Sequence, residues 1–419
     1  MQDILEAQKA ILVSIAPTAK DLAEVNKSLD ELERLLDTAG GVAFARVVQV
    51  KDKFDVRTCI GSGKVLEVKT LAETNDIHLV VFDFELSPAQ IRNLEDELGD
   101  VDVIDRSMLI LDIFAKHAVT GEGKLQVELA QLKYTAPRLV GKGKDLSRLG
   151  GGIGTRGPGE SKLESDRRHL HERINTLERQ LRELEHNRGV MRAARDRSGI
   201  PKIAIVGYTN AGKSTLLNAL TNAGVLCENK LFATLDPTTR KLTLPQGEEV
   251  LLTDTVGFVR KLPHHLVHAF RSTLDEVTYA DLVVLVSDVT DPEVDEHIQV
   301  TEEIMRDLGA IGKPTLYVYN KCDLLPEFPK TGIKKDDLNV YISADKGYGI
   351  QLFLEAIEQI LSQGKKRVTL MFGYAEQGKL SALHADGQVE DVEYTSDGVR
   401  VTATLDGKGL GKYKAYIIE

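Results

Sequence analysis

The sequence predicts an α/β protein with several domains, and three observations lead to this prediction. Four apolar residues, Ile203 to Val206, precede a glycine-rich turn and then a stretch with the apolar spacing of a helix. Strand-like and helix-like segments also alternate nearer the N-terminus, which is typical of a parallel sheet. The length of 419 residues corresponds to roughly two to four domains. We expect a central α/β domain, an N-terminal α/β domain with a helical hairpin, and a small C-terminal α+β domain.

The expected boundaries follow changes in composition. The N-terminal domain is placed at 1–137, a basic loop and long helix at 138–198, the central domain at 199–364 and the C-terminal domain at 365–419. No apolar run approaches the roughly 20 residues of a membrane span, and the N-terminus lacks the pattern of a secretion signal. Three scattered cysteines suit a reducing compartment, so we expect a cytoplasmic protein.

In the N-terminal domain, Leu29, Leu32, Leu35 and Leu36 have helical spacing before Gly40. Strands are expected at 42–50, 77–84 and 101–105, and helices at 87–98 and 107–117. Residues 61–64, Gly-Ser-Gly-Lys, resemble half of a phosphate-binding loop. They lack the upstream glycine and the following Ser or Thr, so a tight turn before a helix is favoured over a second nucleotide site.

A glycine-rich basic segment spans residues 138–159. It contains eight glycines and five Lys or Arg residues, while Asp145 is its only acidic residue. Glycine-rich chain cannot form a core, and its positive charges suit RNA phosphates. Although the net charge of the whole chain is −11, we favour RNA contact over a flexible linker. The candidate contact residues are Arg138, Lys142, Lys144, Arg148 and Arg156.

A long helix is expected next, because apolar residues recur at alternating three- and four-residue spacing. They are Leu163, Leu170, Ile174, Leu177, Leu181 and Leu184. We expect this seam to pack against residues 125–134 as an antiparallel hairpin within a monomer. A homodimeric coiled coil is the alternative, and three heptads support it only weakly.

Residues 207–214 read GYTNAGKS, a full match to the phosphate-binding loop G-x-x-x-x-G-K-[ST]. The glycines allow consecutive N–H groups to face an anion at a helix N-terminus. Lys213 would reach the outer phosphates, and the Ser214 hydroxyl would bind Mg²⁺. A chance strand–helix turn is the less favoured alternative. The candidate nucleotide contacts here are Gly207, Tyr208, Thr209, Asn210, Ala211, Gly212, Lys213, Ser214 and Thr215.

The base is predicted from residues 320–323, Asn-Lys-Cys-Asp, which follow an apolar strand and match the NKxD pattern. The Asp323 carboxylate can accept two hydrogen bonds from guanine, whereas adenine offers no such donor pair. Lys321 can cover the base and Asn320 can join this segment to the phosphate loop. Ser343 and Ala344 would supply a backbone N–H to the guanine carbonyl. We therefore expect GTP and GDP as ligands.

Two further segments have the positions of nucleotide-sensing switches. In the first, which includes Phe232, Ala233, Thr234 and Leu235, the Thr234 hydroxyl would bind Mg²⁺ and the Thr234 N–H would contact the γ-phosphate. In the second, Asp254, Thr255, Val256 and Gly257, the carboxylate would hold Mg²⁺ through water and the Gly257 N–H would contact the γ-phosphate. Such contacts exist only while that phosphate is present. Lys213, Asn210, Thr234 and Gly257 are the candidate catalytic residues.

Phe258 stands where many GTPases carry the glutamine that orients the attacking water. Another group or a partner must then complete the site, and His264 and His265 are the nearest candidates. These two and His268 could also suggest a metal site, but without a carboxylate or Cys at ligand spacing, histidines on a helix surface are the commoner case. Asn210 has the position of an asparagine that coordinates K⁺ in some GTPases. A K⁺ ion could replace the charge of an arginine finger. The equally weighted alternative is that Asn210 only braces the loop.

Together, GYTNAGKST, LFATLDPT, DTVGF and the segment GFVRKLPHHLV resemble the HflX family of translational GTPases. The upstream stretch GGGIGTRGPGESKLESDRR is similar to that family's signature. The resemblance covers roughly residues 40–365. It implies a P-loop GTPase fold, a cytosolic location, binding to the large ribosomal subunit and its RNA, and a role in splitting or rescuing stalled ribosomes under stress.

Two other functions stay open. One is an RNA-binding assembly or nucleotide-sensing factor in which hydrolysis is incidental. The other, an N-terminal ATPase, rests on residues 61–64 alone. The C-terminal residues predict strands at 368–372, 388–394, 399–405 and 412–418 and no identifiable chemistry, so a docking domain is expected.

Overall fold

The computed structural model describes residues 8–138, 158–196, 199–221, 230–232, 235–263, 266, 271–310, 312–327, 339–363, 366–405 and 407–418. The chain divides into two compact units. The first comprises residues 1–184 with 226–236 and 256–273, and the second comprises 185–225, 237–255 and 274–419. No helix among the described residues is long and apolar enough to cross a membrane.

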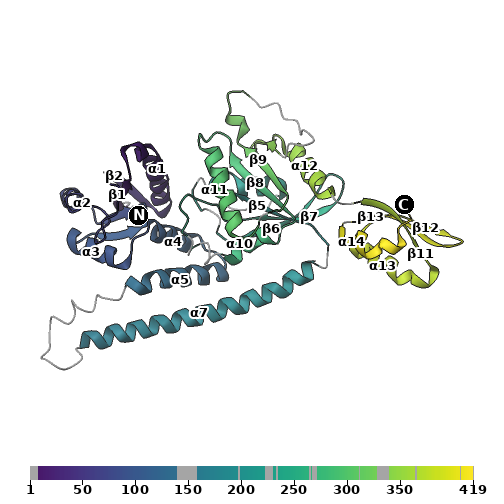
Figure 1. Cartoon of the computed structure of the whole chain (residues 1–419), viewed down its shortest axis with the longest axis horizontal. Helices are drawn as coiled ribbons and strands as arrows, with labels where there is room; N and C mark the ends of the chain where they lie inside the picture. The colour runs from purple at the N-terminus through teal and green to yellow at the C-terminus, as the bar shows by residue number, and fades with distance from the viewer. Residues whose placement is uncertain are drawn as a thin grey trace, which may run out of the picture. The chain divides into compact units, whose positions relative to one another are not determined.

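The first unit contains a four-stranded parallel sheet in the order β2-β1-β3-β4, with helices on both faces (Figure 1). α2 and α3 cover one face, where Val68, Ile91 and Leu94 join the core around Val80 and Phe82. The elements are β1 (Gln8–Ala16), η1 (Ala19–Asp21), α1 (Leu22–Ala39), β2 (Gly41–Val50), α2 (Ser62–Asn75), β3 (Leu79–Phe82), α3 (Pro88–Leu98), β4 (Asp102–Asp105), α4 (Arg106–His117), α5 (Gly121–Thr135) and η2 (Ala136–Arg138).

The parallel sheet and its helices were predicted, but β1 was missed. Its buried run from Ala10 to Ala16 forms the strand that pairs with both β2 and β3. Ser87 caps α3 as expected, through a capping box with Gln90. Gly61 is the N-cap of α2, as the interpretation of residues 61–64 as a turn requires.

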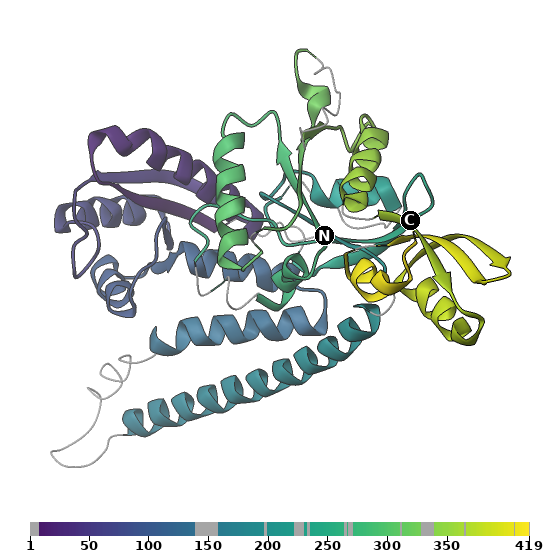
Figure 2. The ribbon, with the colours of Figure 1, turned by 45° about the vertical axis from the view of Figure 1, so that its right-hand side comes forward.

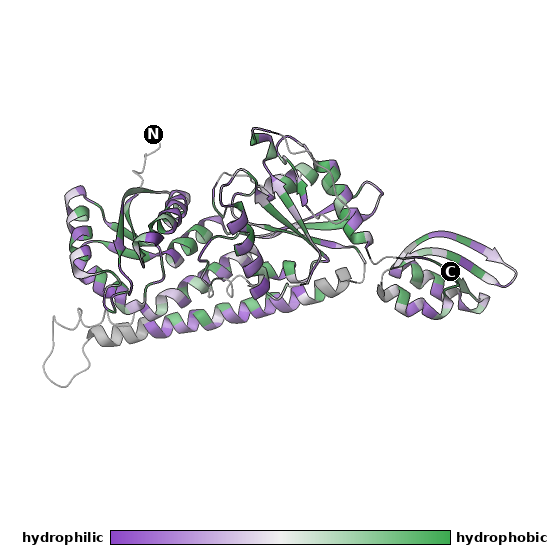
Figure 3. Cartoon of the chain, turned by 45° about the horizontal axis from the view of Figure 1, so that its top comes forward, coloured by the Kyte–Doolittle hydropathy of each residue, from purple (hydrophilic) through white to green (hydrophobic). Residues whose placement is uncertain are grey.

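α7 (Pro158–Asp196) follows the basic segment, and its residues up to Leu184 belong to the first unit. It lies beside α5, with the chain running in the opposite direction (Figures 1 and 2). Arg173 pairs with Glu128 and Lys133 with Glu178 across these helices, and Leu177 is fully buried. α7 is largely hydrophilic (Figure 3), so only a narrow stripe of it faces a core. The predicted hairpin is therefore present.

The second unit contains a six-stranded sheet in the order β10-β9-β8-β5-β7-β6, in which only the β6–β7 pair is antiparallel. Leu216 and Leu217 of α8 and Phe353 and Ile357 of α12 pack against its strands. The elements are β5 (Lys202–Gly207), α8 (Lys213–Thr221), β6 (Thr238–Thr243), β7 (Glu249–Asp254), α10 (Arg271–Thr278), β8 (Leu282–Asp288), α11 (Val294–Asp307), β9 (Thr315–Asn320), η3 (Cys322–Leu324), β10 (Asn339–Tyr341) and α12 (Ile350–Ser362).

The C-terminal residues form a three-stranded antiparallel sheet in the order β11-β13-β12. The expected strand at 412–418 is wrong, because this stretch contains the end of a helix, a 3-10 turn and a single bridge from Ile417 to Leu370. The tyrosines there cover the sheet: Tyr413 is buried, and both it and Tyr416 contact Phe372. The elements are β11 (Lys366–Phe372), η4 (Tyr374–Glu376), α13 (Gln377–Asp386), β12 (Gly387–Thr395), β13 (Gly398–Leu405), α14 (Gly407–Tyr413) and η5 (Lys414–Tyr416).

Candidate GTP-binding site

The phosphate loop connects β5 to α8 at the carboxyl end of the central strand. Gly207 has a φ of +148°, and a Cβ there would lie 2.1 Å from the Val286 carbonyl oxygen. Gly212 has a φ of +94°, and a Cβ there would lie 2.2 Å from Nδ2 of Asn320. Both positions therefore require glycine for conformation and for space. Asn210 lies between them with a φ of +62°, a conformation that asparagine tolerates better than most residues.

Lys213 is buried under the loop, and its Nζ donates to the Tyr208 carbonyl at 2.8 Å. Burial lowers the pKa of Lys213 to about 8, while the charge of Asp254 acts in the opposite direction. An ammonium group held in a site that disfavours its charge gains most from an arriving anion. Thr209 adds a buried hydroxyl for which the described structure provides no hydrogen-bond partner.

Ser214 and Asp254, the two predicted Mg²⁺-binding residues in the second unit, are in contact with each other. The Ser214 hydroxyl donates to Oδ2 of Asp254 at 2.6 Å, and Asp254 is fully buried at the end of β7. Desolvation raises the pKa of Asp254, opposed by Lys213, Ser214 and the Thr255 amide. Its other oxygen, Oδ1, is buried without a hydrogen-bond partner in the described structure. A hydroxyl and an orphaned carboxylate oxygen beside a phosphate loop fit Mg²⁺, which prefers oxygen ligands and retains water.

Asn320 joins the predicted base-binding segment to the phosphate loop. Its Nδ2 donates to the Ala211 carbonyl at 2.9 Å, and its Oδ1 accepts from the Ala344 amide at 3.0 Å. The Ser343 amide donates to the Tyr348 carbonyl. Both amides expected to face guanine are thus engaged within the protein, so a guanine carbonyl would have to share or replace the bond from Ala344.

Lys321 and Asp323 follow at the end of β9. Lys321 has a φ of +65°, and its Nζ forms an ion pair with Asp288 at 2.6 Å. This pairing fixes the end of a side chain whose stem was expected to cover the base. Asp323 lies half-buried in η3. The phosphate loop, Asp254, Asn320, Asp323 and the 343–344 segment therefore all belong to the second unit.

Thr255 also belongs to the second unit, whereas the other predicted nucleotide residues fall in the first unit or outside the described residues. Phe232, Leu235, Val256 and Gly257 belong to the first unit. Ala233, Thr234, His264, His265 and His268 lie outside the described residues, as do Lys142, Lys144, Arg148 and Arg156. Arg138 is described: it stacks on Tyr134 and lies 3.5 Å from Asp105. Its charge is therefore partly used within the protein.

The sequence alone did not predict the contacts that the first switch segment makes. Phe232 is buried, with its ring 4.7 Å from that of Phe114 in α4. The Asp236 carboxylate accepts hydrogen bonds from the amides of Val119 and Thr120, at 2.9 and 2.8 Å, and from the Thr120 hydroxyl. Thr120 is itself the N-cap of α5.

The second switch segment is held by charge. Nζ of Lys261 lies 2.7 Å from Oδ2 of Asp83 and 2.8 Å from Oγ of Ser28. The Arg260 carbonyl accepts from buried Arg106 at 3.0 Å. Phe258 is buried as well, and its apolar ring has no group that could orient an attacking water. Both switch segments thus contact the helices and strand ends of the first unit.

Comparisons with known proteins agree with this site. Family models match residues 26–115 (GTP-binding GTPase N-terminal), 117–195 (GTP-binding GTPase Middle Region) and 202–321 (50S ribosome-binding GTPase). A solved GTP-binding protein of Sulfolobus solfataricus in complex with GDP covers 85% of this chain and 99% of its own at 28% identity. Its TM-score is 0.43.

Relatives named GTPase HflX match nearly the whole chain. That of Caldanaerobacter subterraneus subsp. tengcongensis is 50% identical over 99% of this chain and 94% of its own length. That of Escherichia coli is 41% identical over 93% of this chain and 91% of its own. With its phosphate loop, Mg²⁺-type oxygen pair and NKxD segment in one unit, the chain belongs to the HflX family of GTPases.

Proposed function

We propose that this GTPase is a cytoplasmic switch that binds the large ribosomal subunit and its RNA in the GTP state, and leaves after hydrolysis. The observation that carries the proposal is the match of residues 202–321 to the 50S ribosome-binding GTPase model. A role in splitting or rescuing stalled ribosomes is the finer form of this proposal. It is supported by membership of the HflX family.

The nucleotide contacts within the second unit are proposed as follows. Lys213 and the loop amides hold the β- and γ-phosphates, Ser214 and Asp254 hold Mg²⁺ directly and through water, and Asp323 selects guanine. Bound Mg²⁺ neutralises charge on the phosphate oxygens. Thr234 and Gly257 complete the site from the two switch segments. Binding of a K⁺ ion by Asn210 stays a prediction. The left-handed backbone at this position is by itself a sufficient reason for an asparagine there.

The coupling of nucleotide state to the first unit is proposed from the switch contacts. Asp236 and Lys261 lie two and four residues from the predicted γ-phosphate sensors Thr234 and Gly257. Both make charged contacts in the first unit, with Thr120 and Asp83 respectively. Loss of the γ-phosphate would therefore alter the ends of α5 and β3 through only a few residues of chain. The basic segment that follows α5 would contact RNA.

Sedimentation with separated ribosomal subunits tests the proposal. We expect the protein to pellet with the large subunit in the presence of a non-hydrolysable GTP analogue and to stay in the supernatant with GDP. A Lys213→Ala variant, which lacks the phosphate-binding ammonium group, should stay in the supernatant in both states. No binding in either state would refute ribosome association. Equal binding in both states would favour an assembly factor in which hydrolysis is incidental.

A further inference from the structure

The ring of Tyr208, the second residue of the phosphate loop, stacks on the ring of His297 in α11. The ring centroids lie 3.7 Å apart, and the ring planes are inclined by 12°. Tyr208 is 7% exposed and His297 is 9% exposed, so the stack is almost entirely buried. Both residues belong to the second unit, where the parallel pairing of β5 with β8 brings the phosphate loop close to the start of α11.

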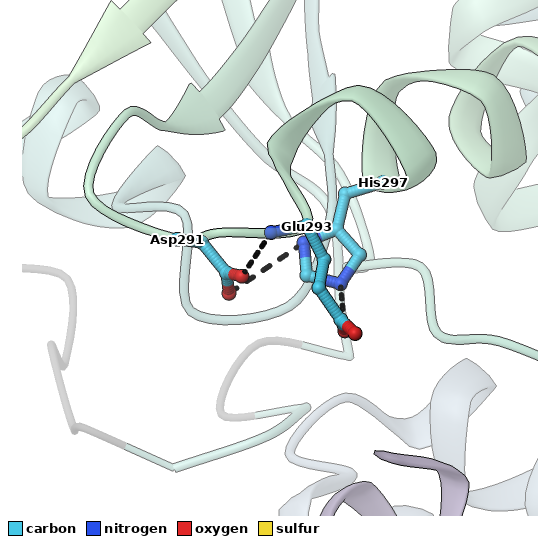
Figure 4. A group of neighbouring side chains, drawn as sticks. All are labelled: Asp291, Glu293 and His297. Carbon is cyan, nitrogen blue, oxygen red and sulfur yellow. Dashed lines mark hydrogen bonds and ion pairs between the residues drawn. The ribbon is translucent and has the colours of Figure 1, made fainter. Parts of the chain in front are cut away.

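The local structure holds His297 in place through its backbone and its surroundings. Its amide donates to the Glu293 carbonyl at 2.9 Å, and its carbonyl accepts from the hydroxyl of fully buried Thr301 at 2.8 Å. Figure 4 shows that Asp291 and Glu293 face different nitrogens of the ring. Oδ2 of Asp291 lies 3.7 Å from Nδ1, and Oε2 of Glu293 lies 3.9 Å from Nε2. The imidazole is therefore a fixed surface against which Tyr208 packs.

The carbonyl of Tyr208 joins this stack to the phosphate-binding ammonium group. It accepts from Nζ of Lys213 at 2.8 Å and from the Ala211 amide at 3.3 Å. The preceding residue, Gly207, has a φ of +148°, and glycine has more conformational freedom than any other residue. Gly207 alone therefore does not fix the direction in which Tyr208 leaves β5. The stack on His297 supplies that restraint, and the carbonyl moves with its own residue.

We propose that His297 is a positioning residue for GTP binding and hydrolysis, which holds Tyr208 and thereby sets the Lys213 ammonium group at the outer phosphates. The inference rests on the proposed role of Lys213 in binding those phosphates. A charged group that is already in position lowers the cost of binding and of reaction, because no rearrangement has to follow. An aromatic pair changes an equilibrium constant by about 2- to 13-fold, which sets the size of the expected effect.

Substitutions of the His297 ring test the proposal in the full-length protein. Titration calorimetry measures the affinity for a non-hydrolysable GTP analogue and the fraction of chains that bind it. We expect His297→Ala and His297→Gln to weaken analogue binding by about 2- to 13-fold and to slow single-turnover hydrolysis. His297→Phe keeps a flat ring, so it should restore both quantities. Gln299→Ala changes an exposed side chain of the same helix and is the matched control that should behave as the parent does.

A double-mutant cycle tests whether His297 acts through Tyr208. Tyr208→Leu removes the other ring of the stack and keeps the backbone carbonyl, so it should weaken analogue binding by a similar factor. The double variant Tyr208→Leu with His297→Ala should bind about as well as the weaker single variant, because both changes remove the same interaction. Additive losses of binding free energy would overturn the proposal.

Two results at His297 itself would also overturn it. One is parent-like analogue binding by His297→Ala. The other is restoration by His297→Gln but not by His297→Phe, which would assign the effect to polar contacts with Asp291 and Glu293. If His297→Ala binds the analogue substoichiometrically because it folds poorly, the comparison of His297→Gln with His297→Phe decides.

Lys213→Ala separates this proposal from the proposed function. It should weaken analogue binding more than any His297 variant, because it removes the ammonium group itself. Parent-like binding by Lys213→Ala would refute its role at the phosphates, and the positioning role of His297 with it. A loss in Lys213→Ala together with parent-like binding by His297→Ala would refute the positioning role alone.

Discussion

Arg106→Met tests the buried charge cluster that holds the second switch segment. Arg106 is 1% exposed; it lies 2.8 Å from Asp83, pairs with Glu31, and donates to the Arg260 carbonyl. Removing one partner of a buried ion pair costs about 3–5 kcal/mol, because a charge is left buried without compensation. Asp83 keeps Lys261, Ser28 and Ser14 as partners, so we expect the lower end of this range.

Arg46→Met is the matched control, because Arg46 likewise joins two acidic residues, in this case both in α1. It lies 2.6 Å from Asp30 and pairs with Glu33, but all three side chains are at least one-third exposed. Exposed pairs contribute about 0–1 kcal/mol. Native-state hydrogen exchange of peptides from β1 and β3 measures the opening free energy of this sheet without requiring two-state unfolding of the whole chain. Equal losses in the two variants would refute this account of the cluster.

Three further predictions concern the nucleotide and RNA sites. Asp323→Asn should cost about 2–4 kcal/mol of GTP affinity and favour xanthosine triphosphate, and an unchanged preference in a competition assay would remove Asp323 from the base site. Arg148→Ala with Arg156→Ala should weaken ribosome binding and flatten its salt dependence while GTP affinity stays constant; identical binding across a salt series would make the segment a linker. Burial lowers the pKa of Lys213 to about 8 in the free protein, and a bound phosphate favours the ammonium form. GDP binding should therefore take up a proton above pH 8, and GDP affinity should fall as the pH rises. Calorimetry in buffers of different ionisation enthalpy measures this uptake, and no uptake at pH 9 would contradict the prediction.

Local signals in the sequence predicted most of the fold. The spacing of Gly207 and Gly212 predicted the phosphate loop. The structure shows why both positions are glycine, because a Cβ would collide with backbone atoms at Gly207 and with a side chain at Gly212. Ser87 before Pro88 predicted the start of α3. β1 was missed because its apolar run directly precedes an acidic stretch with helical spacing. Residues 1–40 were interpreted mainly from that stretch. The error at 412–418 has a similar cause, since apolar and aromatic residues of a helix end and turn can resemble a strand.

Long-range partners could not be predicted from one sequence. Arg106 opens a helix next to Asp105, and no local pattern indicates that its guanidinium is buried between Asp83 and Glu31. His297 is likewise one of several histidines in polar surroundings. Tyr208 and His297 are 89 residues apart in sequence, and their stacking depends on how β5 and β8 pair in the sheet. Such contacts follow from tertiary packing, which overrides local pattern.

The position of Asp236 links the two functions proposed for this chain. In sequence it belongs to the first switch segment, close to the predicted γ-phosphate sensor Thr234. In the structure its carboxylate accepts from the amides of Val119 and Thr120, the two residues before α5, and a Cβ added at Gly123 would lie 2.4 Å from its Oδ1. α5 leads through η2 to the basic segment, and α7 returns from that segment along α5. A carboxylate near a helix N-terminus stabilises its start, and this one also holds the N-cap Thr120, so displacing Asp236 destabilises the start of α5. We infer that the first switch signals to the basic segment by making and breaking this contact with the N-cap of α5.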